Sequence, residues 1–201
     1  MAKNSAKHAE PDHPIQRPFM ERWSPYVFSG KPVPEQDLRS LFEAARWSAS
    51  SFNEQPWRYV VARQSDGAAF QRLLECLSEA NQKWARHAPV LALGLIKKTF
   101  TRNGKPNRVA EHDLGAASAA LTTEATVRGL HVHQMAGVDV AKAHEAIGAP
   151  EDFEVITALA IGYAGDEGEE AHLERDAKPR TRKPLADFVF GAEFGHKADW
   201  V

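Results

Sequence analysis

The alternation of hydrophobic and polar positions predicts a chain of mixed helices and strands. After Pro34, the residues Leu38, Leu41, Phe42 and Ala45 recur at the spacing of one helix face, and acidic residues occupy the first turn, where the helix dipole favours them. Apolar runs bounded by Pro, Gly and polar residues are typical of strands. We expect helices at 34–50, 67–81, 109–128 and 140–148, and strands at 57–63, 88–98 and 153–164. This irregular order favours an α+β sandwich over a regular βαβ repeat.

The two ends of the chain differ from this central pattern. Residues 1–17 are polar, contain Pro11 and Pro14 and lack apolar periodicity, so we expect a mobile tail outside the fold. Beyond Gly165 the sequence is charged and loop-like, and the apolar stretch FVFGAEFG at 188–195 has no partner helix of its own. We therefore predict a single domain at 18–201 whose C-terminal arm packs on a second copy.

Composition narrows the classes of function. The 201 residues include 25 Lys and Arg against 27 Asp and Glu, a net charge of −2, which gives no general attraction for nucleic acid or an anionic membrane. The opening residues lack the apolar middle of a secretory signal and no apolar run is long enough to span a bilayer, so we expect a cytoplasmic protein. The single Cys76 lies beside Leu73, Leu74 and Leu77, which predicts a buried helical thiol rather than a nucleophile.

Several common site motifs are missing from the chain. Neither glycine-loop nucleotide motif occurs, and the GxSxG nucleophile motif is also absent. His131 and His133 would share one face of a strand, and His112 and Asp113 lie upstream. Because no third ligand follows at a typical spacing, we predict no metal centre.

Two arginine-bearing segments near opposite ends of the chain are candidates for binding an anion. Arg22 and Ser24 alternate in ERWSPYVFSG, so an extended backbone would point both side chains the same way. Arg180 and Arg182 alternate in PRTRKPL. Each segment alone would be interpreted as a solvated surface, but a phosphate is well held by converging guanidinium groups.

A third polar cluster follows the first predicted helix. Ser50, Ser51, Asn53 and Gln55 precede Trp57. In a surface turn these side chains would satisfy local backbone groups. Beside an aromatic residue, they also suit a heteroaromatic ring with several polar edges.

In this order, the segments resemble the nitroreductase family. Its members carry an N-terminal R-x-S-x-R-x-F segment, a P/S-S-x-N-x-Q-P-W segment, a Gly-containing turn after a long helix of small residues, and a C-terminal R-x-R-K-P-L. This chain reads RWSPYVF at 22–28, SSFNEQPW at 50–57, HQMAGVD at 133–139 and RTRKPL at 180–185. The resemblance covers about 20–190 and departs at Tyr26, where the family has a second basic residue.

The resemblance implies a sandwich with a mainly antiparallel central sheet flanked by helices, in an intertwined homodimer that binds FMN at its interface. The arginines would meet the phosphate, and the Ser and Asn side chains would reach the ring from the partner subunit. Backbone N–H groups around Ala136 and Gly137 would face the flavin N5, with Met135 packing against the isoalloxazine. The cofactor-binding residues carried over by motif position are Arg22, Trp23, Ser24, Tyr26, Ser50, Ser51, Phe52, Asn53, Gln55, Met135, Ala136, Gly137, Arg180 and Arg182.

The activity that the resemblance implies is hydride transfer from NAD(P)H, through the flavin, to a small flat acceptor such as a nitroaromatic or a quinone. No catalytic side chain is needed because the cofactor carries the chemistry, and two substrates that share one pocket predict ping-pong kinetics. The polar loop at 98–108 is the candidate lid. Two alternatives stay open: an FMN enzyme with other chemistry, such as enal or aldehyde reduction or dehalogenation, and a flavin storage or sensor protein.

Overall fold

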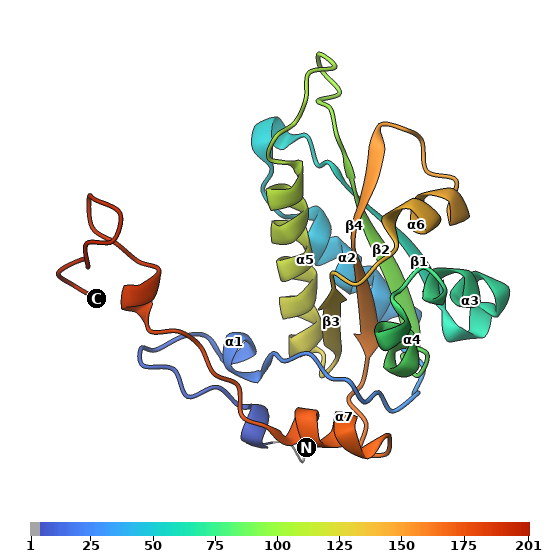
Figure 1. The fold of residues 1–201 in the computed structure, drawn as a ribbon, viewed down its shortest axis with the longest axis horizontal. Helices are drawn as coiled ribbons and strands as arrows, with labels where there is room; N and C mark the ends of the chain where they lie inside the picture. Colours follow the sequence, from blue (N-terminus) through green and yellow to red (C-terminus); the bar gives the residue numbers. More distant parts are fainter. Residues whose placement is uncertain (1–4) are drawn as a thin grey trace.

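A computed structural model describes residues 5–201 of the chain (Figure 1). Its centre is a four-stranded antiparallel sheet in the order β1-β2-β4-β3. The strands are β1 (Trp57–Arg63), β2 (Val90–Lys97), β3 (His131–Met135) and β4 (Phe153–Gly162). Helices flank the sheet, which confirms the predicted α+β sandwich with an antiparallel centre.

Both faces of the sheet are covered by helices, which explains why its central strands are apolar over most of their length. The long helices α2 (Glu35–Arg46) and α5 (Ala110–Val127) cover one face. The short helices α3 (Ala68–Leu74), α4 (Glu79–Ala85) and α6 (Val140–Ala146) cover the other. Along β2, alternate residues divide between the two cores: Val90 and Ala92 enter the α2–α5 side, and Leu91 and Leu93 enter the opposite side.

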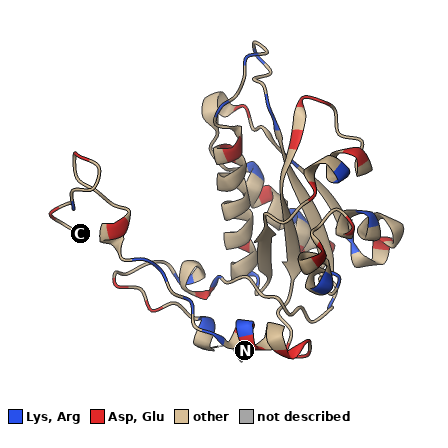
Figure 2. Ribbon diagram, viewed as in Figure 1, with Lys and Arg blue, Asp and Glu red and all other residues tan. Residues whose placement is uncertain are grey.

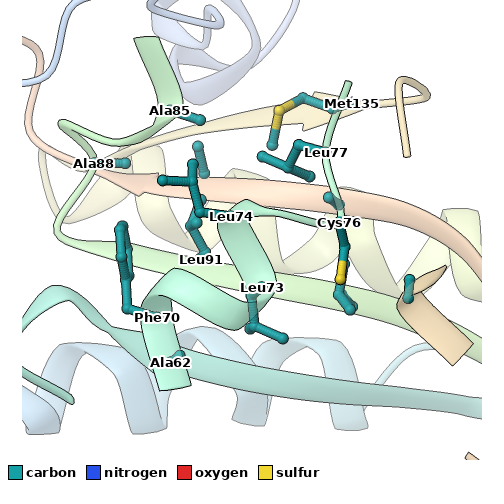
Figure 3. Close-up of a cluster of buried hydrophobic side chains, with 14 of the residues drawn as sticks. Ala62, Phe70, Leu73, Leu74, Cys76, Leu77, Ala85, Ala88, Leu91 and Met135 are labelled. Atoms are coloured by element: carbon teal, nitrogen blue, oxygen red, sulfur yellow. The ribbon is translucent and has the colours of Figure 1, made fainter. Parts of the chain in front are cut away.

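The core beneath the short helices contains the only cysteine of the sequence (Figure 3). Cys76 is fully buried there, and its thiol donates to the Arg72 carbonyl at 3.1 Å. Burial raises the pKa of this thiol, so the thiolate that a nucleophile requires is disfavoured. The predicted burial of Cys76 is confirmed, although the residue lies just beyond the end of α3.

The helix expected at 67–81 is wrong as a single element, because the chain forms two shorter helices there. Residues between α3 and α4 bond instead to the segment that follows β3. The Ser78 N–H donates to the Gly137 carbonyl, and the Cys76 carbonyl accepts the Asp139 N–H. A bridge between Leu77 and Val138 lies between these two bonds. This long-range pairing takes backbone groups that a continuous helix would have used.

The terminal segments contain more structure than the sequence predicted. The N-terminal segment has η1 (Ser5–Lys7) and α1 (Arg17–Glu21), and the charged C-terminal region that we expected to be loop-like forms α7 (Glu170–Ala177). In α7, the Asp176 carboxylate accepts the N–H groups of Tyr26 and Val27 at 2.9–3.0 Å, which fixes a polar helix that has little apolar surface. The mobility predicted for 1–17 stays a prediction, and 1–4 lie outside the described residues.

Beyond α7 the chain extends away from the sandwich as an arm, which includes η4 (Leu185–Asp187) (Figure 1). Large apolar side chains on this arm lie open to solvent, with Phe194 92% and Trp200 77% exposed. Single exposed apolar residues are common on protein surfaces, and the packing of this arm on a second copy stays a prediction.

Candidate functional site

The N-terminal segment 22–28 is extended next to the start of β3. The Arg22 guanidinium donates to the Ser24 hydroxyl at 3.2 Å, so these two side chains share one side as their alternation predicted. Trp23 points the other way: it is 6% exposed, and its ring centroid lies 5.1 Å from that of His131. The alternation therefore gives this segment a polar edge and an anchored apolar edge.

Arg180 and Arg182 lie close to Arg22, although they are far away in the sequence. Burial and the charge of Arg182 lower the pKa of Arg22, and burial with the charges of Arg22 and Arg182 lowers the pKa of Arg180. Their hydrogen bonds go to the Ser24 hydroxyl and to backbone carbonyls. Three positively charged side chains thus share one region, and the acceptors of their hydrogen bonds are uncharged. This arrangement favours binding of an anion.

The histidines of β3 lie beneath this group of arginines and are held neutral. Burial lowers the pKa of His131 to about 4. The charge of Arg22 lowers this pKa further, and a hydrogen bond with the Trp23 backbone opposes the shift. His133 bonds through Nδ1 to the Pro25 carbonyl at 2.8 Å. No group of three potential metal ligands occurs in the described part of the chain. The two rings pack on aromatic neighbours, His131 against Trp23 and His133 against Tyr26 and Trp84.

Tyr26 belongs to an aromatic cluster next to the arginines. Its ring stacks on His172, with centroids 5.6 Å apart and an interplanar angle of 5°, and it packs edge-on against His133 and Trp84. The Arg175 guanidinium lies 4.1 Å from the ring centroid. The Tyr26 side chain therefore packs between α7 and the sheet. A basic residue, which the family has at this position, would instead contact an anion.

The turn after α2 has an unusual backbone. It contains η2 (Ser51–Asn53), and Phe52, Asn53 and Gln55 all have positive φ angles of 51–55°. Residues other than glycine enter this left-handed region at a cost of about 1 kcal/mol or more each. Such a concentration of strained residues is typical of segments whose shape serves a site.

Contacts inside and beneath the turn hold that shape. The Ser50 hydroxyl accepts the Gln55 N–H at 3.0 Å, and the buried Asp113 carboxylate at the start of α5 accepts the Ser51 N–H at 3.1 Å. The side chain of Gln55 donates to the carbonyl and side-chain oxygens of Asn53. The sequence drew attention to Asp113 only as a possible metal ligand, and its bond to this turn was not apparent because the partner lies 62 positions away.

Phe52 and the loop at 98–108 cover the outer side of this turn. Phe52 is 70% exposed, and the Arg102 guanidinium lies 3.8 Å from its ring centroid. Phe100 packs edge-on against Phe52, and the Thr101 N–H donates to the Glu54 carboxylate at 2.9 Å. The candidate lid is therefore attached to the Ser50–Gln55 turn through several side chains.

The arginine group and the Ser50–Gln55 turn lie at opposite ends of α5 (Figure 1). Asp113, in the first helical turn of α5, bonds to the Ser50–Gln55 turn. The charge of Arg22 lowers the pKa of His131, which follows the last helical turn of α5. The 18 residues of α5 correspond to a length of roughly 27 Å at the rise of an α-helix. A single chain therefore does not bring the two predicted halves of the site together.

The HQMAGVD segment leads away from the arginines along β3. Met135 is 4% exposed and its side chain lies in the core under the short helices (Figure 3), whereas Ala136 is exposed. A Cβ on Gly137 would lie 2.6 Å from Asn81 Nδ2, so only glycine fits this position without a shift. The Gly137 carbonyl accepts the Ser78 N–H and the Asn81 side-chain amide, so this turn packs closely on the start of α4, while the Met135 side chain packs in the core. The contact of Ala136 and Gly137 with a flavin stays a prediction.

Comparison with known proteins identifies the family. The model of the Nitroreductase family matches residues 19–83 and 69–163. The chain is 42% identical over 148 residues to an uncharacterized 15.4 kDa protein of Mycolicibacterium smegmatis, covering 69% of this chain and 98% of that one. It is also 39% identical over 95 residues to the major NAD(P)H-flavin oxidoreductase of Aliivibrio fischeri, covering 45% and 43% of the two chains.

A solved structure, described as the oxidoreductase containing FMN, superposes with a TM-score of 0.88 at 33% identity, covering 98% of this chain and 100% of that one. The chain belongs to the nitroreductase family, which confirms the resemblance of its four sequence segments.

Proposed function

We propose that the protein is an FMN-dependent oxidoreductase that uses NAD(P)H to reduce a small flat acceptor, such as a nitroaromatic or a quinone. The observation that carries the proposal is that Arg22, Arg180 and Arg182, from opposite ends of the chain, lie close enough for their charges to lower the pKa values of the first two, next to the Ser24 hydroxyl. Similarity to a structure that contains FMN, and to a flavin oxidoreductase that uses NAD(P)H, supports it.

The donors in this region fit a phosphomonoester. A phosphate dianion accepts several charge-assisted hydrogen bonds, and guanidinium groups match its geometry. The Ser24 hydroxyl, already 3.2 Å from Arg22, adds a donor of the kind that a phosphate or a ribityl hydroxyl accepts. The cationic end of the site would therefore hold the phosphate, and β3 would lead from it toward the ring.

We also propose that the site is completed by a second copy of the chain. The outer face of α5 carries small residues at helical spacing: Gly115, Ala116, Ala119, Ala120 and Thr123. Nothing lies within 4 Å of a Cβ placed on Gly115, so another helix could approach this face closely. A two-fold arrangement across this face would carry the Ser50–Gln55 turn of one copy toward the arginines of the other.

In this arrangement the chain supplies position and charge. Bound FMN would supply the redox chemistry, by accepting a hydride from NAD(P)H and passing it to the acceptor. The backbone around Ala136 and Gly137 would border the ring, and Ser50, Ser51 and Asn53 of the neighbouring copy would bond its polar edge. Since NAD(P)H and acceptor would use the same open face in turn, we expect ping-pong kinetics, with the 98–108 loop influencing which acceptors enter.

Purification and anaerobic reduction test the proposal. We expect a yellow protein that releases FMN when denatured, loses its flavin colour with NADH or NADPH, and regains it on addition of a nitroaromatic or a quinone. A colourless protein that binds no added FMN would contradict the proposal. Tight FMN binding without reduction by either nucleotide would instead indicate a flavin storage or sensor protein.

A further inference from the structure

The N-terminal segment 5–21, here called the N-terminal arm, packs against the C-terminal part of the chain next to the arginine group. The Lys7 ammonium donates to the Arg175 carbonyl of α7 at 2.8 Å. The Ala9 N–H donates to the Met20 carbonyl at 2.9 Å, so the arm folds back on itself. Figure 1 shows this arm running beside α7 and the segment that follows it.

The arm fixes the direction of Arg180. The Arg180 Nε donates to the Lys7 carbonyl at 2.7 Å, and Nη2 donates to the Met20 carbonyl. Both acceptors belong to the arm, one from each of its ends. Two bonds to a rigid planar group determine its orientation, so the arm sets where the remaining N–H groups of Arg180 point.

Lys7 also brings its own positive charge to this region. Its Nζ lies 5.5 Å from the Trp23 ring centroid, on the segment that carries Arg22 and Ser24. Burial lowers the pKa of Lys7, the Asp176 carboxylate opposes that shift, and the charge of Arg180 adds to it. Asp176 already accepts the N–H groups of Tyr26 and Val27. Figure 2 shows Lys and Arg positions on both arms.

The Asp176 carboxylate offsets part of the positive charge of Lys7, but both of its oxygens already accept backbone N–H groups. Because Arg22, Arg180 and Arg182 lie in the same region, the positive charge there favours an added anion. We infer that the N-terminal arm is part of the phosphate subsite: Lys7 adds a fourth positive charge, and its carbonyl, with that of Met20, positions Arg180. This inference rests on the proposed function, because the anion concerned is the FMN phosphate. An arm that served only as a structural strap would stabilise the fold without any preference for a phosphorylated flavin.

The test compares two flavins that differ only in the phosphate. The apoprotein and its Lys7→Met variant are titrated with FMN and with riboflavin, following flavin fluorescence at several salt concentrations. For Lys7→Met we expect an FMN dissociation constant that is roughly 10-fold higher, as for the loss of one charge-assisted contact. The salt dependence of FMN binding should be shallower, riboflavin binding should change by less than about two-fold, and Lys7→Arg should restore most of the FMN affinity.

Lys31→Met is the matched control. Lys31 also places its ammonium over an aromatic ring, 4.5 Å from the Tyr163 centroid, but it does not act on the arginine group. Its substitution should leave both dissociation constants unchanged. If Lys7→Met leaves FMN affinity and its salt dependence unchanged, or weakens FMN and riboflavin equally, the inference is overturned. A wild-type chain that binds no FMN would overturn the proposed function itself, and this result is distinguishable from both outcomes described for Lys7→Met.

Discussion

The Asp113 carboxylate at the start of α5 accepts the Ser51 N–H at 3.1 Å, and this bond ties the strained Ser50–Gln55 turn to the longest helix of the described chain. Asp113 is 4% exposed, and a buried carboxyl group is stabilised by a hydrogen bond of this kind. The bond makes the shape of the turn depend on a residue that contacts no proposed ligand.

Replacing Asp113 with Ala should therefore affect both stability and flavin binding. The change leaves the Ser51 N–H without its acceptor, which costs about 1–3 kcal/mol, and it releases a turn with three positive φ angles. We expect a lower free energy of unfolding in denaturant titrations and weaker FMN retention. Glu111→Ala is the control, because Glu111 occupies the same helical turn but is exposed. Equal effects from both variants would show that only the charge near the helix end matters.

Arg22→Ala tests the phosphate assignment directly. Loss of a charge-assisted contact should weaken FMN binding by about 1.5–3 kcal/mol, which is roughly 10- to 150-fold in dissociation constant. Equilibrium titration of the apoprotein measures the change. Arg39→Ala, on the exposed face of α2, should bind FMN like the wild type. Unchanged affinity in Arg22→Ala would remove Arg22 from the phosphate site.

The elements that local pattern determines were predictable from the sequence. Strands β1 and β2 were expected at 57–63 and 88–98 and form at Trp57–Arg63 and Val90–Lys97. Two-sided burial leaves a plain apolar run in β2, and β1, a half-exposed edge strand, is marked by aromatic and β-branched residues after Pro56. The break in the helix expected at 67–81 was not predictable, because it results from the long-range pairing of Leu77 with Val138. Helix α7 was missed for a similar reason: its anchor, Asp176, bonds to Tyr26, 150 positions earlier.

In the candidate site too, residues in a local pattern were predictable and residues placed by long-range contacts were not. The alternation of Arg22 with Ser24, and of Arg180 with Arg182, is visible in the sequence and indicated an anion site. Lys7 lies in a polar segment without periodicity, and its contacts depend on the path of the C-terminal arm, so no local signal pointed to it.

The buried imidazole of His131 predicts a dependence of stability on pH. Its pKa of about 4 lies below the ordinary value of 6.5, so between these values the unfolded chain binds a proton that the folded chain does not. The contribution is fully present above pH 6.5 and is lost as the pH falls toward 4, by up to about 3 kcal/mol. In urea titrations from pH 4 to 7, His131→Gln should show a flatter pH dependence than the wild type. The exposed His112→Gln should follow the wild type, and a His131→Gln profile parallel to it would refute the assignment.

The Arg102 guanidinium over Phe52 predicts how the 98–108 loop affects acceptor choice. An exposed contact of this kind is worth about 0.5–1 kcal/mol, so Arg102→Ala should free both Phe52 and the loop without disturbing the arginine group. On the proposed function, we expect kcat/KM to change by roughly 2- to 5-fold for large aromatic acceptors and less for small quinones, with FMN affinity unchanged. Lys105→Ala, which removes a charge from the same loop, should leave kcat/KM unchanged for both classes of acceptor. If Arg102→Ala changes all acceptors by the same factor, the loop does not select among them.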